Sequence, residues 1–177
     1  MAIIAVVLLL FSGLAATATA ASQNTTSPAN AASSRPDKPV ERHTSTTVYG
    51  WVSQNYLAAH PQYLRSQAAK VGATVAPSAV TPQSAFTCDG PVCIDVQGSG
   101  LKVNQWNTTA TGNVGCSEAS YIRNGATVFV SDSICPSGSG SGVYYYYTNP
   151  NTTYPNNTKL CNVWEWFVGY PCANVHR

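Results

Sequence analysis

The sequence has little charge. Nine of its 177 residues are Lys or Arg and seven are Asp or Glu, together 9% of the chain, whereas an average globular protein has about 25%. The net charge of +2 is not gathered into a basic cluster, so little attracts the chain to a phosphate backbone. We therefore expect no nucleic acid among its partners.

Long apolar runs are also absent. The run from Ile3 to Leu10 is too short to cross a bilayer, which takes about 20 residues, and no later segment is longer. Small residues follow at Ala18-Thr19-Ala20, as at a signal peptidase site. Residues 1–20 are therefore predicted to be a signal peptide, and the mature protein is expected to be secreted, extracellular and without a membrane span. No Lys or Arg precedes the apolar run, which leaves a retained N-terminal anchor as the alternative.

Cysteine is missing from the first 87 residues, and CxxC spacing is missing throughout. The six cysteines are Cys88, Cys93, Cys116, Cys135, Cys161 and Cys172. Export favours three disulfides, and neither a metal site nor a cofactor is expected. Local pairing ranks first: Cys88 with Cys93, Cys116 with Cys135, and Cys161 with Cys172. The middle pair is supported by an Asn124-Gly125 hairpin, which would bring its cysteines nearly opposite each other.

Composition divides the mature chain into three parts. Residues 21–47 are rich in Ser, Thr, Pro and Ala, with too few large apolar side chains to offset the entropy of ordering, and are predicted to be a disordered tail. Residues 48–87 are expected to form a short helical annex and a linker, with a helix from Pro61 to Val71 that ends at Gly72. Residues 88–177 form the predicted β domain.

The β domain is predicted from an apolar period of two, interrupted by turn residues about every ten positions. The expected fold is mainly β: an antiparallel β-sandwich of about seven strands, stapled by disulfides, after a short N-terminal helix and a disordered tail. The expected strands are Val92 to Val96, Leu101 to Thr109, Gly115 to Arg123, Ala126 to Asp132, Val143 to Thr148, Lys159 to Phe167 and Cys172 to His176.

Aromatic side chains are the candidates for binding. Alternate residues of a strand face opposite sides, so two rings of the Tyr144 to Tyr147 run would point outward, and Trp164 and Trp166 would share a face. Exposed rings with little charge around them suit a neutral polysaccharide or an extracellular protein. Alternatively, the rings fill a small core. The candidate binding residues are Tyr144, Tyr145, Tyr146, Tyr147, Trp164 and Trp166.

Catalysis has less support. His43, His60 and His176 lie far apart in the chain, and no sequence motif marks a nucleophile. Four acids, Glu118, Glu165, Asp95 and Asp132, could supply the carboxylate pair of a glycosidase. No residue is assigned a catalytic role.

Four N-x-Ser/Thr sequons, at Asn24, Asn107, Asn151 and Asn156, are possible glycosylation sites.

A recognisable pattern near the C-terminus consists of Asn157-Thr158-Lys159-Leu160-Cys161-Asn162-Val163-Trp164 followed by Gly169-Tyr170-Pro171-Cys172-Ala173. This pattern resembles small exported β-rich bacterial proteins of unknown function. The segment from Val96 to Val103 and the Asn124-Gly125 hairpin extend this resemblance over about Phe86 to Val175. It implies export and a β-sandwich and transfers no activity.

The leading hypothesis is a non-enzymatic binding or interaction module. The alternatives are a secreted hydrolase that uses Glu165 or Asp132, and a secreted toxin or inhibitor that presents the Ser137 to Gly142 loop.

Overall fold

The computed structural model describes residues 38–72 and 85–177, and within them the protein is mainly β. The predicted signal peptide and the sequon at Asn24 lie outside these residues. The helices are α1 (Gln54–Ala59) and α2 (Tyr63–Lys70). The strands are β1 (Val40–His43), β2 (Thr47–Ser53), β3 (Ala85–Asp89), β4 (Val92–Ser99), β5 (Lys102–Gly112), β6 (Ala119–Arg123), β7 (Ala126–Val130), β8 (Gly142–Thr148), β9 (Thr152–Thr153), β10 (Thr158–Trp164) and β11 (Cys172–Val175).

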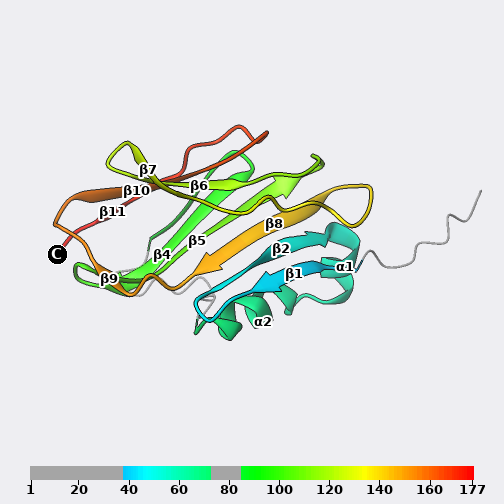
Figure 1. The fold of residues 1–177 in the computed structure, drawn as a ribbon, viewed down its shortest axis with the longest axis horizontal. Coiled ribbons are helices and arrows are strands. Elements are labelled where there is room, and N and C mark those ends of the chain that lie inside the picture. Colours follow the sequence, from blue (N-terminus) through cyan, green and yellow to red (C-terminus); the bar gives the residue numbers. More distant parts are fainter. Residues whose placement is uncertain (1–37, 73–84) are drawn as a thin grey trace, which may run out of the picture. The chain divides into compact units, whose positions relative to one another are not determined.

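The strands form two antiparallel sheets (Figure 1). The larger sheet has the order β1-β2-β8-β5-β4-β3, and β9 adds to β5. The smaller sheet has the order β11-β10-β6-β7. Each of the seven strands expected from the sequence overlaps one observed strand, and β1, β2, β3 and β9 are additional.

The larger sheet is buried on both faces along β2 and β8. Because successive side chains alternate between faces, Tyr144 and Tyr146 join Trp51 in a core cluster that also contains residues of the smaller sheet. Tyr145 and Tyr147 point to the opposite face, where they pack with apolar side chains of α1 and α2. This double burial explains why β2 and β8 are almost continuously apolar or aromatic.

The two helices lie between β2 and the segment that precedes β3. Ser53 begins α1 by accepting a hydrogen bond from the Tyr56 amide (3.1 Å), the usual role of a serine N-cap. Helix α2 lies inside the range in which the sequence predicts a helix. Gly72 follows with φ 70°, a left-handed conformation that glycine adopts readily at a helix end.

The Asn124-Gly125 hairpin forms as predicted between β6 and β7. Both turn residues have positive φ, 51° and 85°, as a two-residue turn of this type requires. The three disulfides are those ranked first from the sequence: Cys88–Cys93, Cys116–Cys135 and Cys161–Cys172. In the first and third pairs, the cysteines are direct cross-strand partners.

The structure differs from the sequence prediction near residue 40. Strand β1 lies inside the segment predicted as a disordered tail, and β2 begins at the last residue of that segment, Thr47, and continues into the predicted annex. Val40 pairs with Trp51, and His43 pairs with Val48. The backbone hydrogen bonds of β2 stabilise a strand whose own composition is too polar to predict one.

Candidate functional site

The four consecutive tyrosines of β8 do not form a binding face. Tyr144, Tyr145, Tyr146 and Tyr147 are 0%, 0%, 6% and 5% exposed. The sequence hypothesis assumed that one face of this strand meets solvent, but the helices cover that face. Core packing, the alternative reading of the rings, is therefore the one that the structure supports for these residues.

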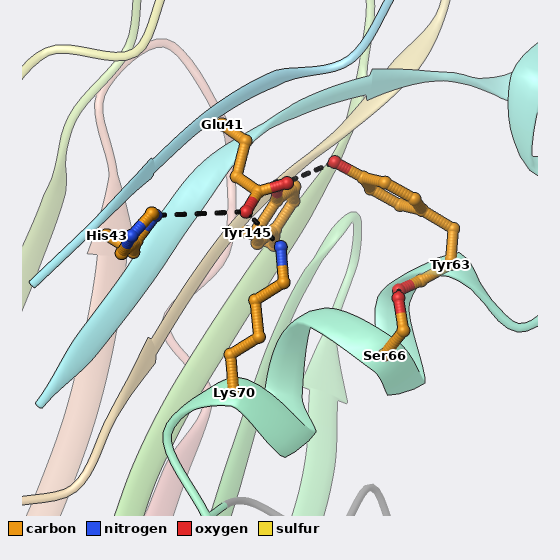
Figure 2. A network of polar contacts seen from close by, with 6 residues as sticks. All are labelled: Glu41, His43, Tyr63, Ser66, Lys70 and Tyr145. Atoms are coloured by element: carbon orange, nitrogen blue, oxygen red, sulfur yellow. Dashed lines mark hydrogen bonds and ion pairs between the residues drawn. The ribbon is translucent and has the colours of Figure 1, made fainter. Parts of the chain in front are cut away.

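Tyr145 instead belongs to a polar cluster between α2 and the strands of the larger sheet (Figure 2). Its hydroxyl lies 3.1 Å from the Tyr63 hydroxyl. On the same side, Glu41 of β1 forms an ion pair with Lys70 of α2 and lies 4.0 Å from Nδ1 of His43. The cluster therefore ties α2 to two strands of the larger sheet.

Burial keeps the hydroxyls of Tyr63 and Tyr145 protonated. Burial raises the pKa of Tyr63 to about 12 and raises that of Tyr145 further above the ordinary value of 10. A hydroxyl with a raised pKa is a poor base or nucleophile near neutral pH. The cluster is thus suited to holding a helix and not to proton abstraction.

The two tryptophans at the end of β10 have opposite environments. Trp164 is 1% exposed, and its indole N–H donates a hydrogen bond to Oγ1 of Thr108 (3.0 Å). Trp166 is 71% exposed and has φ 67°. The sequence prediction placed both on one face of a strand that continues to Phe167, and this is wrong because β10 ends at Trp164.

Residues 165–171 form a loop between β10 and β11, which we call the tryptophan loop. The Cys161–Cys172 disulfide closes its base. Its exposed apolar side chains are Trp166, Val168 (87% exposed) and Tyr170 (44%). Phe167 turns inward, and its ring centroid lies 5.4 Å from that of Tyr144. Along the loop, the Phe167 side chain therefore packs against the core, while those of Trp166, Val168 and Tyr170 point to solvent.

Hydrogen bonds hold the tryptophan loop in place from both sides. The Tyr170 amide donates to Oδ2 of Asp89 (2.8 Å), and Ser117 Oγ donates to the Glu165 carbonyl (2.6 Å). Gly169 passes so close to β3 that a Cβ there would lie 2.1 Å from the Asp89 carbonyl oxygen. The loop is therefore preorganised before any ligand arrives.

The backbone of Trp166 is strained. A bulky side chain rarely adopts positive φ, and such a conformation costs about 1–3 kcal/mol, which the surrounding structure must offset. The indole recovers little of this cost by burial, because it is mostly exposed. Strain at an exposed aromatic residue is a reason to suspect a binding role, and the tryptophan loop is accordingly the candidate site.

The structure brings together the backbones of only two of the four candidate acids. Glu165, in the tryptophan loop, donates its backbone N–H to the Glu118 carbonyl (2.9 Å). Asp132 instead accepts a hydrogen bond from the Tyr49 hydroxyl (2.6 Å). Asp95 lies on the larger sheet, where burial raises its pKa.

The sequons differ in accessibility. Asn107 is 2% exposed and its side-chain oxygen accepts a hydrogen bond from the Thr148 amide, so the folded chain cannot carry a glycan there. Asn151 and Asn156 are exposed near β9.

Within residues 38–72 and 85–177, no three His, Cys, Asp or Glu side chains are grouped so as to hold a metal ion. In the same residues, no helix has both the length and the apolar character to cross a membrane.

A second exposed apolar surface lies on β7, an edge strand of the smaller sheet. Val128, Phe129 and Val130 are each about 45% exposed.

Neither the exposure of this edge strand nor the outward positions of Val168 and Tyr170 were predicted from the sequence. For the tryptophan loop a signal was present, because Gly169 and Pro171 are turn-forming residues that interrupt the strand pattern between two cysteines.

The chain matches no protein-family model, no curated protein and no solved structure.

Proposed function

We propose that this protein is an exported, non-enzymatic binding domain that uses the tryptophan loop to hold a neutral polysaccharide. The single observation that carries the proposal is the conformation of Trp166, an exposed indole with positive φ on a loop closed by a disulfide. A rigid aromatic residue loses little conformational entropy on binding, which is why tryptophan dominates many binding hot spots.

Several properties of the tryptophan loop favour a neutral sugar chain. The indole of Trp166 and the phenol ring of Tyr170 supply flat apolar surfaces, and Glu165 is the loop's single charged residue. The exposed Glu165 carboxylate adds hydrogen-bond acceptors for hydroxyl groups and would repel an anionic surface. Ligand sites typically combine apolar walls with a few polar groups in this way.

The proposal includes a secreted location and a two-layer sandwich. Three disulfides support an oxidising compartment. A core cluster that contains side chains of both sheets supports the sandwich. In such a domain the disulfides offset the small core and leave the loops available for contact.

The test is co-sedimentation of the mature protein with insoluble neutral polysaccharides such as cellulose and chitin. Trp166→Ala should weaken retention at least tenfold, which corresponds to about 1.4 kcal/mol. Phe86→Ala is the matched control, because Phe86 is also 71% exposed but lies on β3. If both variants are retained as well as the parent protein, the tryptophan loop is not the binding site.

Two further arms test the other function classes. Zwitterionic lipid vesicles in the same assay would reveal a membrane-binding loop, and capture of the protein by extracellular protein fractions would reveal a protein partner. A panel of glycoside, ester and peptide substrates tests for hydrolysis. Turnover that Glu165→Gln abolishes would replace the binding proposal with an enzymatic one.

A further inference from the structure

A cavity of about 150 Å³ lies where β11 of the smaller sheet meets β3, β4 and β5 of the larger sheet. Its floor is apolar and includes Val96, Val103 and Val175. A cavity of this volume holds several water molecules or a small ligand. It lies away from the tryptophan loop, because Val175 pairs with Thr158 at one end of β10 and the loop begins after the other end.

Two cationic side chains, Lys102 and Arg177, line this cavity together with the imidazole of His176, and no Asp or Glu lines it. This is a local excess in a chain with only nine Lys and Arg residues. The two cationic side chains therefore favour an anionic ligand.

Both walls of the cavity are fixed by backbone contacts. On one side, Lys102 pairs with Thr153, and the Tyr154 amide donates to the Leu101 carbonyl (2.9 Å). On the other side, the Arg177 amide donates to Oδ1 of Asn156 (3.1 Å). The backbone positions from which Lys102 and Arg177 extend are thus fixed, although both side chains are exposed.

We propose that this cavity binds an oxyanion: a sulfate, a phosphate or a carboxylate group. Arg177 can present its guanidinium to two oxygens of such a group, and Lys102 supplies a mobile point charge. The site is independent of the tryptophan loop, so the protein would hold a neutral chain at one end of β10 and an anionic group at the other.

The experiment follows backbone amide NMR signals during titration with sodium sulfate, sodium phosphate or sodium acetate at constant ionic strength. The purification tag is placed on the N-terminal side, so that nothing is added next to Arg177. Saturable shifts confined to Gly98–Val103 and Asn174–Arg177 are expected. Shifts that scatter over the whole domain, or that sodium chloride reproduces, would overturn the proposal.

Charge-removing variants give the second measurement. Lys102→Gln and Arg177→Gln should each weaken binding about three- to tenfold, and the double variant should abolish it. Arg65→Gln is the control, because Arg65 is an exposed cation on α2 outside the cavity. Equal weakening by Arg65→Gln would show general attraction to a cationic protein and would refute the site.

A final arm identifies the source of the oxyanion. Free sulfate is compared with a sulfated disaccharide in the same titration. Tighter binding of the disaccharide, with shifts at the same residues, assigns the cavity to an ester group on a larger molecule. Equal affinity assigns it to the free ion, and binding of neither contradicts the proposal.

Discussion

Raising the pH should unfold this protein cooperatively, because its core contains tyrosine hydroxyls. Five tyrosines, Tyr121 and the four of β8, are at most 6% exposed. Burial raises the pKa of each, to about 12 for Tyr144 and Tyr146. In the unfolded chain, the same groups ionise near pH 10.

The sign follows from proton binding. Above pH 10 the unfolded chain binds fewer protons than the folded chain, so the free energy of unfolding falls as the pH rises. The contribution is complete below pH 10 and is lost as the pH rises towards the folded-state pKa of about 12 given above for Tyr144 and Tyr146.

The magnitude is large because the five effects add. Ionisation in the unfolded chain lowers the free energy of unfolding by about 0.8 kcal/mol per tyrosine at pH 10.5, about 1.4 at pH 11 and about 2 at pH 11.5. Five tyrosines give about 4, 7 and 10 kcal/mol at these pH values. A domain of ordinary stability, about 5–15 kcal/mol, should therefore unfold near pH 11.

The assay records tyrosinate absorbance near 295 nm and circular dichroism on the same samples. The absorbance change of the five buried tyrosines should coincide with the circular dichroism change in one steep transition, in addition to the rise from the other five of the ten tyrosines. Tyr147→Phe should reduce the steepness of this transition by about one fifth. A gradual absorbance rise centred near pH 10, with the circular dichroism unchanged, would mean that the hydroxyls reach solvent in the folded protein. That result would refute the burial argument.

Three other predictions concern the framework. Replacing Cys116 and Cys135 together by Ala should lower the free energy of unfolding by about 3 kcal/mol in urea denaturation, since the bridge closes a loop with a sequence separation of 19; an unchanged midpoint would show that the bridge adds no stability. Gly142→Ala should cost at least about 1 kcal/mol by overpacking, because its Cβ would lie 2.3 Å from the indole nitrogen of the β2 tryptophan; a neutral result would mean that this part of the core is loosely packed. A double-mutant cycle with Tyr63→Phe and Tyr145→Phe should give a coupling energy of about 1 kcal/mol for their hydroxyl contact, and additive effects would contradict that hydrogen bond.

Local signals predicted much of the β domain. The Asn124-Gly125 turn fixes its own hairpin through positive φ, and the cysteine pairs follow from short chain separations. The period-two pattern located the seven strands that overlap observed ones, because side-chain alternation is a local property.

Features that depend on distant segments were not predictable from sequence. The strand character of β1 depends on its partner β2, and the burial of Tyr145 depends on a helix about 80 residues earlier in the chain. The left-handed conformation of Trp166 also has no sequence signature, because it results from contacts that fix the loop on both sides. Of the six candidate binding residues, only Trp166 is exposed, and the other five are buried.

The burial of β8 also bears on where a ligand can bind. An antiparallel sheet often binds ligands on an open face, but here the helices cover one face of the central strands, and the side chains of the other face share a core cluster with residues of the smaller sheet. In the described residues, the large apolar side chains that reach solvent lie instead on β3, on β7 and in the tryptophan loop. Strand β7 is held to the sheet by β6 alone, whereas the tryptophan loop is closed by a disulfide and anchored through Phe167. Since rigid presentation reduces the entropy cost of binding, a ligand would bind at the tryptophan loop, where Trp166 is exposed, at a lower entropy cost than at β7.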